Sequence, residues 1–210
     1  MIKAILWDND GVLVETEHLY FEATQHVLAT VGVELTRAQY LELFLKQGRG
    51  AWHLAEERGL GSAEIEALRD TRNQLYAAWL PREPRVMPGV AEVLAALHGR
   101  YVMGVVTSSR RDHFDVIHES SGLLRYFDFL VTADDVRHVK PNPESYIRAV
   151  RQSGCPADAC LAIEDSERGL QAALGAGVRC VVVPTALTRG TAFTGAHRVL
   201  ASLAELHDVL

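Results

Sequence analysis

The chain has 210 residues, of which 48% are hydrophobic and 23% are charged, and its formal net charge is -6 at pH 7. This length can bury a full core as one large domain or two small ones. The net charge is negative, so the composition lacks the excess of basic residues that is typical of nucleic-acid-binding proteins. No apolar run is long enough for a signal peptide or a membrane span. We therefore expect a cytoplasmic protein that binds neither nucleic acid nor membrane.

The first predicted element is a short strand over residues 3–7, KAILW. The next segment, residues 15–85, has few strand signals and many helix formers. Apolar residues at i, i+3 and i+4 spacing predict helices within 17–32, 36–48 and 62–80. We expect this segment to form a small helical bundle.

From residue 87 onward, predicted helices and strands alternate. Helices are predicted over 89–97, 112–121, 143–154 and 167–177, and strands over 101–108, 127–132, 160–165 and 178–184. Short apolar strands that alternate with helices indicate a parallel sheet covered on both faces. The simplest architecture is an α/β core of residues 1–14 and 86–210, interrupted after its first strand by the helical segment 15–85. The second boundary lies near the proline-rich stretch PREPRVMPG.

Polar residues end several predicted strands or lie in a loop near them: Asp8, Asp10, Thr107, Ser108, Lys140, Glu164 and Asp165. In open parallel sheets, ligands bind beyond the carboxyl ends of the strands, so we expect these side chains to meet. Carboxylates at one sheet edge repel by roughly 4 kcal/mol per pair at about 4 Å and an effective dielectric near 20, so a cation should lie among them. Oxygen ligands without His or Cys favour Mg²⁺.

Each of these residues, taken alone, also has a simpler interpretation. Asp-x-Asp after a strand is usually turn chemistry, Ser166 and the Thr107–Ser109 run can cap helices, and Lys140 alone is an ordinary surface charge. Together, however, they form a set that phosphoryl transfer uses. One aspartate attacks phosphorus, a second acid protonates the leaving oxygen, a hydroxyl and a lysine hold the phosphoryl oxygens, and acids hold Mg²⁺.

Four motifs in order resemble those of the haloacid dehalogenase superfamily. DNDGVLVE at 8–15 matches the DxDGxxx(D/E) signature, and VVTSS, VKPNPESY and IEDSERGLQAALGAG match the other three. The chain is most similar to the branch of beta-phosphoglucomutase-like and sugar-phosphate phosphatases. This resemblance implies a Rossmann-like parallel core with a small α-helical cap inserted after the first strand.

The resemblance also implies roles for single residues. Asp8 would be the nucleophile that forms an aspartyl-phosphate, and Asp10 the general acid that later activates water. The remaining groups would bind phosphate or metal: Thr107 and Lys140 the phosphoryl group, and Asp8, the Asp10 carbonyl and Asp165, helped by Glu164, the Mg²⁺ ion. Ser108, next to Thr107, is a candidate substrate-binding residue.

The chain departs from the pattern of this branch at two positions. Asn9 stands where an apolar residue is usual, and Glu15 stands where Asp is more common. In the cap, LKQGRGAWHL offers Arg49 as the best candidate for a substrate contact, although Lys46, Trp52 and His53 in the same stretch also fit a structural role.

The leading hypothesis is a Mg²⁺-dependent phosphatase of small phosphorylated metabolites, sugar phosphates above all, that works as a monomer or weak homodimer. The alternatives are a phosphoglucomutase-like phosphotransferase and a non-catalytic phosphate- or metal-binding regulator. The mutase branch carries a histidine five residues beyond the hinge acid, where this chain has Tyr20. A tyrosine keeps its proton at neutral pH, which favours the phosphatase. The intact set of polar residues speaks against the regulator.

Overall fold

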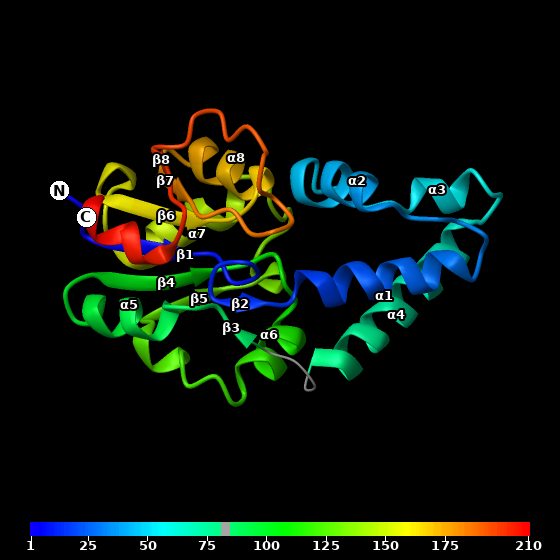
Figure 1. Cartoon of the computed structure of the whole chain (residues 1–210), viewed down its shortest axis with the longest axis horizontal. Coiled ribbons are helices and arrows are strands. Elements are labelled where there is room, and N and C mark those ends of the chain that lie inside the picture. Colours follow the sequence, from blue (N-terminus) through cyan, green and yellow to red (C-terminus); the bar gives the residue numbers. More distant parts are fainter. Residues whose placement is uncertain (81–84) are drawn as a thin grey trace.

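A parallel sheet forms the centre of the protein in the computed structural model, which describes residues 1–80 and 85–210. Within these residues the sheet has six strands in the order β5-β4-β1-β6-β7-β8 (Figure 1). The strands are β1 (Ala4–Trp7), β4 (Val102–Val106), β5 (Phe129–Val131), β6 (Cys160–Glu164), β7 (Arg179–Val182) and β8 (Arg198–Val199). The central strand β1 is apolar throughout because both of its faces are covered.

Helices from the second half of the chain cover the two faces of the sheet. They are α5 (Val90–Leu97), α6 (Arg111–His118), α7 (Glu144–Ser153) and α8 (Glu167–Gly175). Ile5 and Trp7 join a core cluster with residues of α5 and α6, whereas Ala4 and Leu6 join a second cluster with residues of α7 and α8. The alternation of side chains along β1 thus divides the core into two layers.

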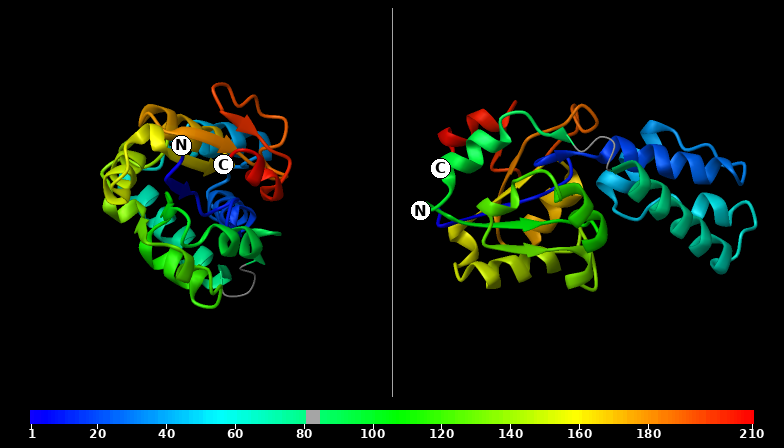
Figure 2. Two further views of the ribbon diagram at one scale, coloured as in Figure 1. Left: turned by 90° about the vertical axis from the view of Figure 1, so that its left-hand side faces the viewer. Right: turned by 90° about the horizontal axis from the view of Figure 1, so that it is seen from below.

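The cap is a helical insertion between β1 and α5. Its elements are α1 (Glu17–Ala29), α2 (Arg37–Tyr40), the π-helix η1 (Leu41–Lys46), α3 (His53–Glu56) and α4 (Ser62–Trp79). They gather at the end of the molecule opposite the two chain termini (Figures 1 and 2). The cap has its own apolar cluster, which includes Leu28, Tyr40 and Phe44. The helix predicted over 36–48 begins at a Thr36 capping box and runs through α2 into η1.

A short ribbon joins the cap to the core. Strand β2 (Val14–Glu15) pairs antiparallel with β3 (Arg85–Val86), so the two connections between the core and the cap lie side by side. Part of the predicted boundary stretch, residues 81–84, lies outside the described residues. The sequence did not indicate β2 and β3, because two-residue strands carry no periodic signal.

The last part of the chain also went unpredicted. It contains the edge strand β8 and the 3₁₀ helix η6 (Leu203–Asp208), which buries Leu203 and Leu206 in the core. Three further 3₁₀ turns are η3 (Leu124–Tyr126), η4 (Ala133–Asp135) and η5 (Ala157–Ala159). Among the described residues, no helix combines the length and apolar character that crossing a bilayer requires.

Candidate active site

Asp8 and Asp10 stand on a tight turn at the carboxyl end of β1. The ladder with β6 continues one residue past the strand, because the Asp8 amide donates to the Ile163 carbonyl at 2.9 Å. The chain then reverses at Gly11, whose φ of 86° lies in the left-handed region. A side chain at Gly11 would collide with the Asp165 carboxylate. Glycine is therefore required here both for the backbone conformation and for the close approach of Asp165.

Lys140 is the buried cation of the site. Its side chain is 2% exposed, and its ammonium donates to Asp8 Oδ1 at 2.7 Å, Glu164 Oε1 at 2.6 Å and the Val106 carbonyl at 2.7 Å. These three acceptors use all three N–H groups. Burial works to lower the pKa of Lys140, but the two carboxylates outweigh it and raise that pKa above its usual value. Lys140 is therefore a fixed positive charge beside Asp8.

Three buried carboxylates lie close together here, and two of them, Asp8 and Glu164, contact the Lys140 ammonium. Asp8, Glu164 and Asp165 each offer an oxygen, and these oxygens lie within 4.8 Å of one another. Burial, reinforced by the Glu164 carboxylate, raises the pKa of Asp8 to about 7 despite the opposing effect of Lys140. Burial together with Asp8 and Glu164 also raises the pKa of Asp165. One ammonium does not balance three such acids, and an all-oxygen donor set fits a hard divalent cation.

Glu164 also holds the Lys140 ammonium in place, an interaction that the sequence did not indicate. It is completely buried at the end of β6, and it accepts hydrogen bonds from Lys140 and, at 2.6 Å, from the Tyr146 hydroxyl. A carboxylate held from two sides in this way fixes the lysine in turn. Glu164 therefore orients Lys140 in addition to lying in the acidic group.

The Asp10 carboxylate is held by hydroxyl groups and is not part of the three-carboxylate cluster of Asp8, Glu164 and Asp165. It accepts from Thr16 at one oxygen, and at the other from Ser109 at 2.7 Å and from Thr107 at 3.4 Å. Thr107 also accepts from the Ser109 amide at 2.9 Å. The sequence indicates Ser109 only as a potential helix cap, although its position in the TSS run is a signal for this contact. Ser108 has a buried hydroxyl with no partner among the described residues.

A cavity of about 330 Å³ opens over these groups between the core and the cap. Of the predicted site residues, its wall contains Asp8, Asp10, Ser108, Lys140 and Arg49. Cations outnumber acids among the described residues that line it: Arg49, Arg69, Arg72, Arg110, Lys140 and Arg168 against Asp8, Asp10 and Glu17. A protein with a net charge of -6 thus has a locally positive cavity, which suits an anionic ligand.

Arg72 on α4 is the most unusual of these cations. It is only 6% exposed, and its guanidinium lies 4.3 Å from the ring centroid of Tyr20 and 5.4 Å from that of Trp52. Its Nε donates to Asn73, whereas its Nη1 is buried without a partner among the described residues. No carboxylate in that described part pairs with it. A buried arginine with free donors is costly unless an anion binds there.

The candidate residues of the cap stretch LKQGRGAWHL lie partly at the cavity and partly at the solvent-exposed surface. Trp52 lines the cavity with Arg49, whose guanidinium lies 3.2 Å from His53 Nε2. Lys46 instead pairs with Glu42 at 3.3 Å on an exposed face. Neither Lys46 nor His53 is among the described residues that line this cavity.

Arg168 and Glu17 complete the wall where core and cap meet. Arg168 lies in the first turn of α8, and Glu17 begins α1. Burial disfavours the charge of Arg168, but Glu17 and Asp8 help to raise its pKa. Glu17 accepts a hydrogen bond from the Tyr40 hydroxyl. The sequence contained no signal for either residue, because the face that a helix turns toward a cavity depends on tertiary packing.

Comparison with known proteins identifies the family. The sequence model of the haloacid dehalogenase-like hydrolases matches residues 5–183. Protein CbbY of Cereibacter sphaeroides is 35% identical over 98% of this chain and 94% of its own. Fructose-1-phosphate phosphatase YqaB of Escherichia coli (strain K12) is 28% identical over 85% of this chain and 95% of its own.

A solved structure agrees with this assignment. A CbbY variant from Rhodobacter sphaeroides, in complex with xylulose-(1,5)bisphosphate, aligns with a TM-score of 0.82 and 30% identity over 98% of this chain and 96% of that chain. The chain therefore belongs to the haloacid dehalogenase-like hydrolase family. It is a hydrolase with the Rossmann-like α/β fold and inserted helical cap that the resemblance implied.

Proposed function

We propose that the protein is a cytoplasmic, Mg²⁺-dependent phosphatase that releases inorganic phosphate from small phosphorylated metabolites, sugar phosphates above all. The observation that supports this most is the buried Lys140 ammonium, held 2.7 Å from Asp8 in the wall of a cationic cavity. In this proposal Asp8, the Asp10 carbonyl, Asp165 and Glu164 hold Mg²⁺. When bound, the ion neutralises the acids and the phosphoryl oxygens.

The chemistry proceeds in two steps. When the ester binds, the Lys140 ammonium exchanges one of its three acceptors for a phosphoryl oxygen, and Thr107 and the Ser108 hydroxyl, which has no partner among the described residues, bind the other phosphoryl oxygens. Asp8 attacks phosphorus while the bond to the leaving oxygen breaks, and Asp10 gives that oxygen a proton. Asp10 then takes a proton from water as the water attacks the aspartyl-phosphate. This second step releases inorganic phosphate and restores Asp8.

The cap has two functions in the proposal. The proposed domains are a cap of residues 15–85 and a core of residues 1–14 and 86–210, and the described cap helices move as a unit with the β2–β3 ribbon at the junction. Closure removes bulk water and brings Arg49 and Arg72 over the bound phosphate ester.

Arg72, which has no carboxylate partner among the described residues, favours substrates that carry a second anionic group. Arg49, Arg69 and Arg72 line the cap side of the cavity, opposite the Asp8 nucleophile. An arginine that is desolvated over aromatic rings binds a phosphate more strongly than an exposed one. Because the similar CbbY structure contains a sugar bisphosphate, we include sugar bisphosphates in the proposed substrate class.

Tyr20 supports hydrolysis over the mutase alternative. It lines the cavity, but its ring lies under Arg72 and packs edge-on against Tyr76 at 5.2 Å. Burial raises the pKa of Tyr20 above its usual value, so it keeps its proton at neutral pH. His18, the other conceivable replacement for the mutase histidine, is not among the described cavity residues.

The test is phosphate release with Mg²⁺ from a metabolite panel that includes xylulose 1,5-bisphosphate, fructose 1-phosphate and a generic aryl phosphate. We expect turnover that the Asp8→Asn variant lacks. Absence of phosphate release from every ester, with the wild-type protein folded, would contradict the proposal.

A further inference from the structure

Asn9 lies between the two catalytic carboxylates, and its side chain is completely buried. Its Oδ1 lies 2.7 Å from His118 Nε2, whereas its Nδ2 is buried without a partner among the described residues. Burying an amide costs free energy that an apolar side chain at this position would not cost, and one hydrogen bond only partly offsets it. This pairing therefore suggests a role other than general stability.

His118 ends helix α6 and is 4% exposed. Burial lowers the pKa of His118 to about 4, so the imidazole is neutral near pH 7. Its Nδ1 lies 2.9 Å from the Ser121 hydroxyl. In a consistent assignment, Ser121 donates to Nδ1, and the proton on Nε2 is donated to Asn9. Both ring nitrogens then have a partner.

The Asn9 backbone holds the catalytic turn together. Its carbonyl accepts from the amides of Val12 at 3.2 Å, Leu13 at 2.8 Å and Val14 at 3.2 Å. A rotation of this peptide would therefore move the whole turn, including both flanking aspartates. The side-chain bond to His118 connects this turn to α6.

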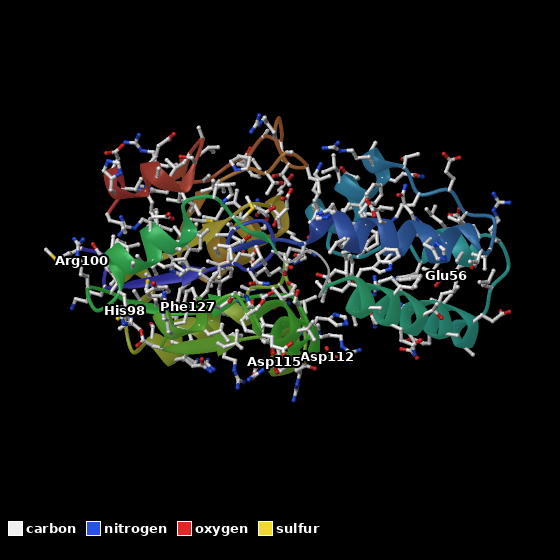
Figure 3. All side chains as sticks on the ribbon, turned by 60° about the horizontal axis from the view of Figure 1, so that its bottom comes forward. Glu56, His98, Arg100, Asp112, Asp115 and Phe127 are labelled. Carbon is white, nitrogen blue, oxygen red and sulfur yellow. The ribbon has the colours of Figure 1, made fainter. Side chains whose placement is uncertain are left out.

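Helix α6 is the element that follows the phosphate-binding loop. It begins at Arg111, directly after the loop that carries Thr107 and Ser109. Asp112 and Asp115 on this helix lie on the outside of the molecule (Figure 3), whereas His118 on the same helix is buried. His118 therefore connects the Asp8–Asp10 turn to the helix that directly follows the loop with two of the Asp10 partners, Thr107 and Ser109.

We propose that Asn9 and His118 are positioning residues, whose hydrogen bond fixes the Asp8–Asp10 turn relative to α6 and the Thr107–Ser109 loop. The inference rests on the phosphatase function proposed above. Misplacing reacting groups by about 1 Å can cost roughly a hundredfold in rate, so partial loosening should lower kcat about tenfold. KM should change little, because neither side chain lines the cavity.

The test compares Asn9→Leu, His118→Leu, the double variant and His118→Gln in aryl phosphate hydrolysis, far below each melting temperature. We expect the single leucine variants to lose kcat. The Gln variant keeps a donor and should retain most of kcat, and the double variant should lose no more than either single leucine variant because all three lack the same hydrogen bond. Ser153→Ala, which removes a buried hydroxyl on α7 outside the site, is the matched control and should keep full kcat.

A purely structural pair would lower the melting temperature and leave kcat unchanged, which would overturn the proposal. A loss confined to KM, or additive losses in the double variant, would also overturn it. If the phosphatase proposal itself is wrong, the wild-type protein will be inactive. The positioning role is then tested by a measurement that does not depend on turnover. In assigned ¹H–¹⁵N spectra, His118→Leu should shift the amides of Gly11 and Ser109, and unshifted amides would refute the positioning role.

Discussion

Replacing Lys140 with methionine should destabilise the protein in a pH-dependent way. The substitution keeps most of the volume but removes the donor to Asp8, Glu164 and the Val106 carbonyl. Removing one partner of a buried ion pair typically costs about 3–5 kcal/mol, because the remaining charge is left uncompensated. We expect the free energy of unfolding to fall by this amount at mildly alkaline pH.

The loss of unfolding free energy should become smaller as the pH falls. The direction of this change follows from the pKa of Asp8. Its pKa is already raised from 3.8 to about 7 with Lys140 present, chiefly by burial, and it should rise further without the ammonium. A carboxyl with a raised pKa binds more protons in the folded state than in the unfolded state. Stability therefore falls with rising pH, by up to about 1.4 kcal/mol per unit and per extra proton, from the unfolded pKa to the folded one.

The measurement is urea unfolding of wild type and Lys140→Met in chelator, at about pH 5 and about pH 8, which lie on the two sides of the folded Asp8 pKa. Lys46→Met is the control, because that exposed lysine pairs only with an exposed glutamate, and we expect no measurable change there. Equal losses at both pH values, or a larger loss at the lower pH, would refute the assignment of the buried charges.

Four further outcomes are expected. Asp8→Asn should eliminate phosphate release and Asp10→Asn should leave only a trace; near wild-type rates for either would contradict their roles. Chelation should abolish activity and Ca²⁺ should restore it poorly, whereas full activity in excess chelator would exclude the metal. Arg72→Gln should lower kcat/KM for a sugar bisphosphate by about tenfold to a hundredfold, with little effect on an aryl phosphate; equal losses would remove Arg72 from the second-anion site. Incubation with β-glucose 1-phosphate or glucose 6-phosphate should yield inorganic phosphate, and fast interconversion of these esters with little free phosphate would favour the mutase.

The sequence alone predicted the elements of the core and the edge where the site lies. Apolar runs of four to five residues such as β1 and β6 end in acids, and the carboxyl ends of parallel strands meet, so Asp8 and Glu164 could be placed together without coordinates. The strand order could not be obtained in this way, because pairing of distant strands leaves no local pattern. The strands β2, β3 and β8 were not predicted because two residues are too few for a periodic signal.

Tertiary structure decided which groups complete the site. Arg72, Glu17 and Arg168 come from helices whose periodicity indicates a buried face but not what that face meets. The polar pair of Asn9 and His118, 109 residues apart in the chain, likewise forms only when α6 packs beside β1. The proposed role of Asp8 as nucleophile thus follows from a local motif next to one strand. The cationic cavity and the support behind the catalytic turn depend on contacts between distant segments, which only the folded chain brings within hydrogen-bonding range.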